Sequence, residues 1–317
     1  MSFLENNCFI LCLSILLMAG CDTSSQTPQP RMITDSALPP VGIENKDSDC
    51  YLISLAQLIL NSPDFLAAFK KVAHKNPIYS DLVEAYQKAQ QEKTFLLTGE
   101  GSAFRKFKQY LHKLYGDDVC KPGASSAPGF VFLKIVPDIL NATDNAWPPV
   151  IKTITTTTTK ESGESKQESL DEYLLNYAGS DGASLDNSDS DMGQEIVKQF
   201  ISREVVRFSK IPESIFFSAN LAPCIKCFSF TMPNQMFNNI KEAEHGIQYK
   251  LSYFAVHIGT VDIGHYLCYM KINGIWYEAE DTHIKQIGDD EEIKKLLKPV
   301  EPQNASIVLL RYERVRS

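Results

Sequence analysis

Cys50 and His265 each stand in a local pattern that suits acyl-transfer chemistry. Cys50 directly follows the polar residues Ser48 and Asp49 and opens an apolar-periodic segment, so we expect it at the start of a helix. The free backbone N–H groups and positive dipole end of a helix stabilise a thiolate, the nucleophilic form of cysteine. Asn45 lies upstream and could turn its side-chain N–H toward a developing oxyanion. Taken alone, Cys50 could also be a small buried hydrophobe, because cysteine is often buried.

His265 begins an apolar and aromatic run directly after Gly264, and two carboxylates, Glu280 and Asp281, close the next such run. A β-hairpin would set these runs side by side, and a carboxylate there would fix the imidazole tautomer and support its protonated form. Gly264 would let another backbone approach His265 closely. We therefore predict that His265 is the base. Neighbouring strand residues point to opposite faces, so only one of the two carboxylates can face it.

The elements that must position these groups can be predicted from the spacing of apolar residues. From residue 50 to about residue 116 they recur at intervals of three and four, which predicts helices. Later segments rich in Val, Ile, Phe and Tyr predict strands. These segments are 130–136, 215–218, 252–257, 265–272 and 306–312. The threonine-rich run 153–159 predicts a thin strand or ribbon. A helical first part followed by a mostly β second part is an α+β fold.

The composition limits the function classes. The chain has 317 residues, 44% of them hydrophobic, and a formal charge of −8. This content allows a large core and excludes a chain that is disordered throughout. The acidic balance argues against a nucleic-acid partner, which would need a basic face. Three of the eight cysteines lie in the N-terminal apolar region, and we expect the others to be mostly reduced because an odd set cannot pair fully.

Cys224 and Cys227 have the C-x-x-C spacing of a zinc-ligand pair. A structural zinc site needs four ligands, and the sequence holds no second pair of this kind. We therefore predict no metal and no cofactor.

The N-terminal region is typical of a targeting segment. Residues 9–20 form an apolar run of the length of a signal-peptide core, and the run ends at Cys21 in a pattern that resembles a bacterial lipobox. Residues 22–40 are rich in Ser, Thr, Gln and Pro, as in a flexible linker. We predict a signal segment with a lipobox, or a hydrophobic anchor, over 1–21 and a catalytic domain over 41–317. The protein would be an exported, membrane-anchored lipoprotein or secreted.

The segment around Cys50 resembles the cysteine box of the ubiquitin-specific proteases, G-L-x-N-x-G-x-x-C-Y-x-N-S-x-x-Q. The residues that match it without a gap are Gly42, Asn45, Cys50, Tyr51, Ser54 and Gln57. Asp47 stands where the family has Gly, and Ile53 where it has Asn. If the family glycine adopts a positive φ, Asp tolerates that conformation better than most residues.

The segment 249–281 resembles the histidine box of the same family, Y-x-L-x-A-V-x-x-H-x-G followed by G-H-Y and W-Y-x-F-D-D. This resemblance implies that His265 is the base. The family places its third triad residue four positions after a tryptophan, here Trp276, and Glu280 occupies that position. We therefore predict that Glu280 orients His265, while Asp281 contributes indirectly, to the oxyanion or its water.

The resemblance covers about residues 41–314 and implies a papain-like cysteine protease fold with a helical thumb, an antiparallel β palm and reduced fingers. It also implies a short helix near residues 169–174 and a structural role for His257. The implied activity is cleavage after the C-terminal glycine of ubiquitin or a ubiquitin-like protein through a thioester. A lipobox would make this a bacterial member, an effector whose substrate belongs to a host.

Two other functions are compatible with parts of the sequence. Asp49 and Cys50 resemble the Asp-Cys pair of small papain-like cell-wall peptidases, although those domains place Cys and His much closer together. The departures at Asp47 and Glu280 are compatible with a catalytically weak ubiquitin-binding module. The presence of both Cys50 and His265 favours the enzyme.

Overall fold

The computed structural model describes residues 38–63, 65–67, 70, 76–120, 126–129, 131, 132, 134, 135, 151–158, 165–172, 175–177, 206, 207, 211–221, 228–234, 237, 240–260, 263–297 and 305–316. The predicted signal segment and most of the predicted linker lie outside these residues. Within the described part of the chain, no helix is both long enough and apolar enough to cross a membrane.

The N-terminal part of the described chain is helical. It contains α2 (Cys50–Asn61), α4 (Pro77–Glu92), α5 (Ala103–Tyr115) and α6 (Asp117–Cys120). The Asn76 side chain caps α4, and the Ser102 side chain caps α5 by accepting from the Arg105 N–H. Gly116 ends α5 with a positive φ. Nearly every residue of α2 is buried, which makes it the central helix of the core.

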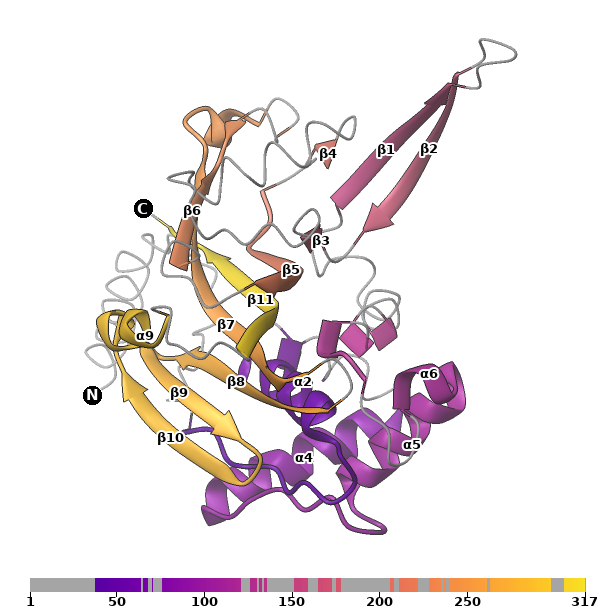
Figure 1. Cartoon of the computed structure of the whole chain (residues 1–317), viewed down its shortest axis with the longest axis vertical. Coiled ribbons are helices and arrows are strands. Elements are labelled where there is room, and N and C mark those ends of the chain that lie inside the picture. The colour runs from indigo at the N-terminus through magenta and orange to yellow at the C-terminus, as the bar shows by residue number, and fades with distance from the viewer. Residues whose placement is uncertain are drawn as a thin grey trace, which may run out of the picture. The chain divides into compact units, whose positions relative to one another are not determined.

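The later part of the chain forms a sheet that is almost wholly antiparallel (Figure 1). Its strands are β3 (Leu175–Tyr177), β5 (Ser214–Leu221), β6 (Ser229–Met232), β7 (Ile247–Gly259), β8 (Gly264–Ile272), β9 (Ile275–Glu280), β10 (His283–Gly288) and β11 (Ala305–Arg314). The order across the sheet is β10-β9-β8-β7-β11-β5-β3, and β6 pairs with β7. Among the described pairings of this sheet, β3 with β5 is the parallel one. The predicted α+β fold is confirmed.

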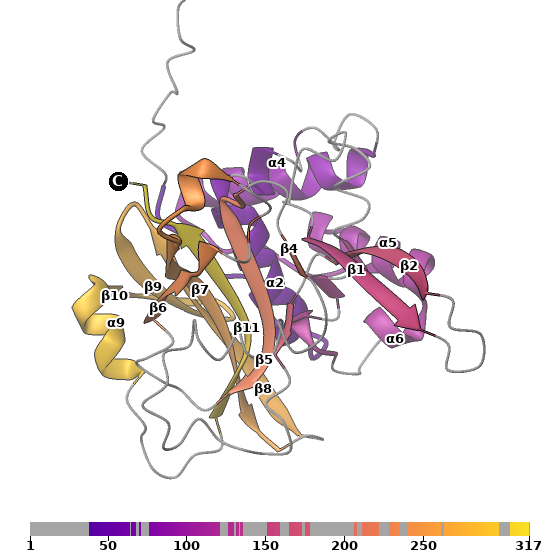
Figure 2. The same cartoon turned by 90° about the horizontal axis from the view of Figure 1, so that it is seen from above.

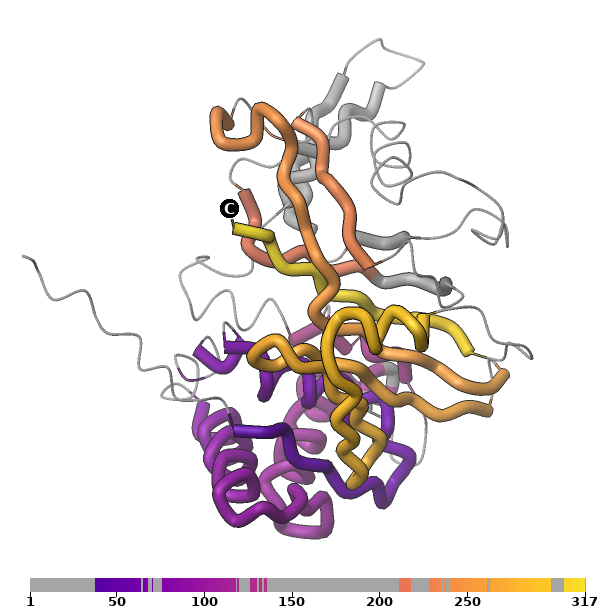
Figure 3. Tube along the Cα trace, turned by 90° about the vertical axis from the view of Figure 1, so that its left-hand side faces the viewer, coloured from indigo at the N-terminus to yellow at the C-terminus, as the bar shows by residue number. Residues whose placement is uncertain are grey.

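Helix α2 packs on the sheet, chiefly against β8 and also against β7 and β9 (Figures 1 and 2). The Tyr253 hydroxyl on β7 donates to the Ser54 carbonyl of α2 over 2.8 Å. Helix α4 packs against α5, away from the strands in the view of Figure 3. The helix that begins at Cys50 therefore lies on the strand that begins at Gly264.

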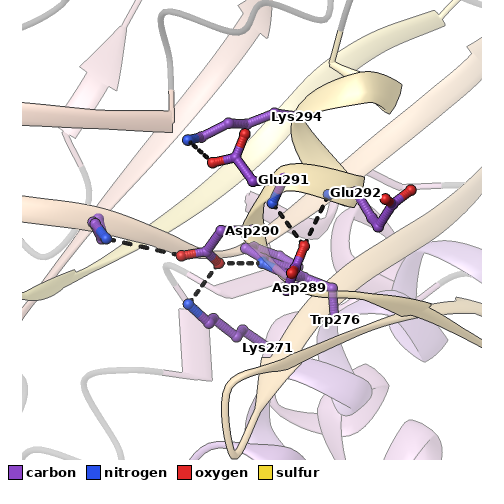
Figure 4. Close-up of polar contacts among 8 residues, drawn as sticks. Lys271, Trp276, Asp289, Asp290, Glu291, Glu292 and Lys294 are labelled. Atoms are coloured by element: carbon purple, nitrogen blue, oxygen red, sulfur yellow. Dashed lines mark hydrogen bonds and ion pairs between the residues drawn. The ribbon is translucent and has the colours of Figure 1, made fainter.

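The buried apolar residues form two clusters, and one of them contains alternate residues of β7 together with Trp276. Beside this cluster, Asp290 begins helix α9 (Asp290–Leu296) and accepts hydrogen bonds from Trp276 Nε1 over 2.9 Å and from Lys271 Nζ over 2.6 Å (Figure 4). Burial opposes the ionisation of Asp290, but these hydrogen bonds and the charges of Lys271 and Lys250 outweigh it and lower the pKa of its carboxyl. Asp290 thus ties α9 to β8 and β9.

Two predictions of local structure are wrong. Residues 128, 129, 131, 132, 134 and 135 are helical, although the apolar run at 130–136 predicts a strand. A short apolar run does not by itself distinguish a buried helix from a strand. Residues 169–172 belong to strand β2 (Ser165–Glu172) and not to a short helix.

Strand β2 pairs with the threonine-rich β1 (Ile151–Thr158), which also pairs with β4 (Val206–Arg207). The β-branched residues of β1 favour an extended chain, so β1 offers β2 a partner strand. The ribbon predicted at 153–159 is therefore present as β1, and the following strand β2 pairs with it.

Among the described residues, no group of three or more His, Cys, Asp and Glu side chains could hold a metal ion. Cys224 and Cys227 lie outside these residues, so the absence of zinc stays a prediction from the sequence. Cys50 and Cys268 are free thiols.

Candidate active site

Cys50 is the first residue of α2, and only 5% of its surface is exposed. Three backbone N–H groups near its sulfur lower the pKa of the thiol: its own, that of Tyr51, and that of Tyr266 on β8. The effect of Tyr266 agrees with the packing of α2 against β8. The packing of α2 on the sheet thus brings the cysteine and histidine boxes together.

Burial raises the pKa of the Cys50 thiol, and the nearby Asp281 carboxylate raises it as well. The backbone N–H of Tyr266 and the two N–H groups at the helix start act in the opposite direction and lower this pKa, but burial prevails. The helix start alone therefore does not produce a thiolate, contrary to the simplest expectation from the sequence. The thiol needs a base to take its proton.

His265 is the second residue of β8 and directly precedes Tyr266. Its Nε2 lies 3.4 Å from Oε1 of Glu280, close enough for an ion pair when the ring is protonated. This nitrogen makes no hydrogen bond to any residue that the structure describes. Because Nε2 faces Glu280, Nδ1 is the ring nitrogen left for the thiol. The structure therefore brings His265 and Glu280 together.

Asp281 has a different partner from Glu280. Its φ of 50° places it in the left-handed region, in the turn that follows β9. Its Oδ2 accepts a hydrogen bond from Asn45 Nδ2 over 3.1 Å, and its carbonyl accepts one from the Ile43 N–H over 2.8 Å. The two carboxylates diverge because the chain turns after Glu280, and not because they alternate along a strand.

Asn45 is held at both ends of its side-chain amide. Its Oδ1 accepts from the Asp49 N–H over 3.0 Å, and its Nδ2 donates to Asp281. An amide nitrogen carries two hydrogens, so one can bond Asp281 while the other points to a substrate oxygen. Asp281 thus fixes the orientation of the predicted oxyanion donor.

One glycine in the cysteine box and one in the histidine box lie so close to neighbouring atoms that a Cβ would not fit. A Cβ on Gly42 would lie 2.2 Å from the carbonyl oxygen of Thr282, in the turn that carries Asp281. A Cβ on Gly264 would lie 2.0 Å from Nε2 of His257. The neighbour of Gly264 is therefore a side chain, where the sequence predicts a backbone.

Asp47 does not occupy the positive-φ position of the turn before Cys50, because Ser48 does, with a φ of 58°. The Asp47 carboxylate instead pairs with Arg105 of α5. Asp49 occupies the N-cap position of α2, but its side chain makes no capping hydrogen bond and pairs with Lys108 of α5. The departure from the family pattern at Asp47 thus adds an ion pair between this turn and α5.

The other histidines show no catalytic arrangement among the described residues. His257 packs against the Tyr266 ring, with 4.7 Å between ring centroids, and burial together with the charge of His265 lowers its pKa. His112 contacts Asp117 over 2.7 Å, and His245 and His283 are exposed. His74 lies outside the described residues.

Lys108 is a residue of this region that the motifs do not reveal. It is buried on α5, within the stripe formed by Phe104, Phe107 and Leu111. A charged residue four positions after an apolar one on a buried helix face is a signal that could have predicted it, because such a charge needs a partner.

These contacts define a cysteine hydrolase: a buried thiol at a helix start, an imidazole on the adjoining strand, a carboxylate at that imidazole, and an amide held nearby. The comparisons name the family. The profile of the family described as ubiquitin carboxyl-terminal hydrolase matches residues 154–310. No curated protein matches the chain.

Among solved structures, the chain is similar to the SAGA DUB module of Ubp8, Sgf11, Sus1 and Sgf73 bound to monoubiquitin. The TM-score is 0.58 at 14% sequence identity, over 97% of this chain and 76% of that chain. It is also similar to the same module bound to ubiquitin aldehyde, with a TM-score of 0.55 at 15% identity over the same shares. At these identities the matches establish the fold.

The chain belongs to the ubiquitin carboxyl-terminal hydrolase family, and its fold is the papain-like fold of the ubiquitin-specific proteases. The matched region contains His265, Glu280 and Asp281 and begins after Cys50. The assignment of Cys50 therefore rests on its own box and on the packing of α2 against β8.

Proposed function

We propose that this protein is a cysteine-type deubiquitinase that hydrolyses the bond after the C-terminal glycine of ubiquitin or a ubiquitin-like protein. The observation that carries the proposal is the packing of α2, which begins at Cys50, against β8, which begins at Gly264 and His265, because it joins the cysteine box to the histidine box inside a chain of this family. The solved structures with the same fold include complexes with monoubiquitin and ubiquitin aldehyde.

In the proposed mechanism, His265 takes the thiol proton and the Cys50 sulfur attacks the glycine carbonyl carbon. The oxygen of that carbonyl gains negative charge, which the second N–H of Asn45 and the N–H groups at the start of α2 stabilise. The C–N bond breaks as His265 returns the proton to the leaving amine, and a thioester forms. Water then attacks the thioester with His265 as base, which releases the glycine carboxylate and restores the thiol.

Glu280 supports this cycle at the stage when the ring is charged. Its carboxylate lies beside Nε2 and stabilises the imidazolium that forms in both steps. Glu280 is exposed, so solvent screens this interaction.

A ubiquitin with an electrophile in place of its last residue tests the function directly. We expect a covalent adduct with the mass of one ubiquitin, and we expect prior treatment with iodoacetamide to prevent it. A ubiquitin-binding module would form only a complex that denaturant separates. A cell-wall peptidase would give neither adduct nor complex, which would refute the proposal.

Replacing Asn45 by Ala is expected to lower kcat about 10²-fold or more, because removing one oxyanion donor acts mainly on the transition state. KM for a ubiquitin-tail fluorogenic substrate should change little. The rate of Cys50 alkylation by a small reagent, which develops no oxyanion, is the control for an intact thiol. An unchanged kcat would mean that backbone N–H groups alone stabilise the oxyanion.

Glu280→Gln and Asp281→Asn are expected to differ in which step they impair. Glu280→Gln removes the charge beside His265 Nε2, so it should lower kcat, because the imidazolium formed in each step is less stabilised, and it should move the acidic limb of the pH profile to lower pH, because the ring holds its proton less tightly. Asp281→Asn replaces the charged acceptor of Asn45 with an amide that can present an N–H in its place, so it should act like Asn45→Ala and add little to it. Steady-state kinetics of the single and double variants over pH check both. Additive losses for Asn45 and Asp281 would contradict this division of roles.

We also propose that the protein is exported and tethered to a membrane through Cys21, on the basis of the apolar run 9–20 and the polar segment after it. Mass spectrometry of the membrane fraction is expected to find a lipid on Cys21. The Cys21→Ala variant should lose the lipid and leave the membrane fraction. An unmodified Cys21 in the purified native protein would refute the tether.

A further inference from the structure

Two ion pairs join helix α5 to the segment that precedes Cys50. Lys108 pairs with Asp49, and Arg105 pairs with Asp47. The two carboxylates are separated by one residue of the turn, and the two cations lie three positions apart, on one face of α5. Helix α5 thus holds the turn at two points.

The pair nearer to Cys50 is buried. The side chains of Lys108 and Asp49 are 4% and 2% exposed, whereas those of Arg105 and Asp47 are 29% and 37% exposed. Burial raises the pKa of the Asp49 carboxyl, and the hydrogen bond and charge of Lys108 act against that rise. A buried pair of this kind adds little net stability, because the cost of removing both charges from water offsets their attraction.

Asp49 connects Lys108 to the groups that would react. Its N–H donates to Asn45 Oδ1 over 3.0 Å, and its carbonyl accepts from the Ile53 N–H over 2.8 Å, in the first turn of α2. The other end of Asn45 reaches Asp281. A single chain of contacts therefore runs from Lys108 through Asp49 and Asn45 to the turn after β9.

We propose that Lys108 is a positioning residue of this site: through Asp49 it holds the turn that places the Cys50 sulfur against its backbone N–H groups and the Asn45 amide against Asp281. The consequences for turnover rest on the proposed function. The consequences for the Cys50 thiol do not, since they depend only on the geometry of the turn.

The double variant Asp49→Asn/Lys108→Met tests the proposal without leaving an unpaired buried charge, which could unfold a single variant. The matched control is Lys106→Met on the same helix. Lys106 has a side chain 53% exposed and pairs with Asp81 only over 3.9 Å. Circular dichroism and thermal melting verify that both variants are folded.

The first measurement is the rate of Cys50 alkylation by iodoacetamide from pH 6 to 12, followed by mass spectrometry of its peptide. In the double variant we expect the midpoint to rise by about one pH unit, because the thiolate loses backbone hydrogen bonds. The other charged or titratable groups on the surrounding elements include Asp47, Arg105, His265, Tyr266, Glu280 and Asp281, and the variant leaves them in place. A folded double variant with the midpoint of the wild type would overturn the proposal.

The second measurement is turnover of the ubiquitin-tail substrate. We expect kcat of the double variant to fall about tenfold or more with KM nearly unchanged, because the reacting groups and not the binding surface are displaced. Lys106→Met should match the wild type in both measurements. If the wild type alkylates normally but never turns over a ubiquitin substrate, the proposed function fails, while the alkylation profile still decides the role of Lys108.

Discussion

Replacing Cys50 by Ala is expected to abolish turnover of ubiquitin substrates and all reaction with the ubiquitin electrophile. The sulfur is the atom that would form the thioester, and alanine provides no nucleophile in its place. The fold should persist, because the change removes one atom from a side chain that already packs as a small buried group. Burst kinetics with the fluorogenic substrate and the mass of the probe adduct measure the loss.

Cys268→Ala is the matched control for this variant. Cys268 is also a buried free thiol, but it lies inside β8, and burial raises its pKa to about 12. It has no helix start beside it, so we expect its replacement to leave the probe adduct intact. If Cys50→Ala still formed the adduct while Cys268→Ala did not, the nucleophile would be wrongly assigned.

The reactive groups could be predicted from the sequence because each is part of a short, continuous motif. Cys50 follows turn residues and opens an amphipathic run, and His265 starts an apolar run after a glycine. Such signals depend on local spacing, and the helices and strands that they predict are present at α2 and β8. The juxtaposition of the two boxes is implied by the family resemblance, and the packing of α2 on β8 accounts for it.

The contacts that tune the site could not be predicted in the same way. The sequence predicts that Asp281 continues the strand of Glu280. In the structure Asp281 has a left-handed conformation, and its side chain bonds Asn45. The sequence predicts that the Asp49 side chain caps a helix. In the structure its carboxylate pairs with Lys108, 59 positions later. Both outcomes depend on neighbours that are distant in the sequence, and local propensity carries no information about them.

The rise in the pKa of Cys50 is another property of the assembled site. A helix start favours the thiolate, and that expectation is sound for an exposed cysteine. Here α2 is buried on nearly every side, so loss of solvent outweighs the backbone N–H groups. The extent of burial follows from the packing of α2 between helices and sheet, which composition and periodicity do not specify.

Replacing His265 by Ala is expected to lower kcat by about 10³-fold or more at neutral pH, since a positioned base and acid contributes up to about 10⁴-fold. The thiol would then have to lose its proton to solvent. Because burial holds its pKa above the usual value, only a small fraction would be ionised near pH 7. The residual activity of the variant should therefore rise steeply with pH into the alkaline range, whereas the wild type should depend on pH far less.

His257→Gln is the matched control for the imidazole. His257 lies on the neighbouring strand, packs against Tyr266 and carries a pKa that burial and the charge of His265 lower. We expect its replacement to reduce kcat by less than about tenfold and to leave the shape of the pH profile unchanged, because it fills space beside Gly264 without taking the thiol proton. The measurement is kcat/KM from pH 5 to 10 for both variants and the wild type. If the pH profile steepened in His257→Gln and stayed flat in His265→Ala, the base would be His257, and the roles assigned to the two histidines would be exchanged.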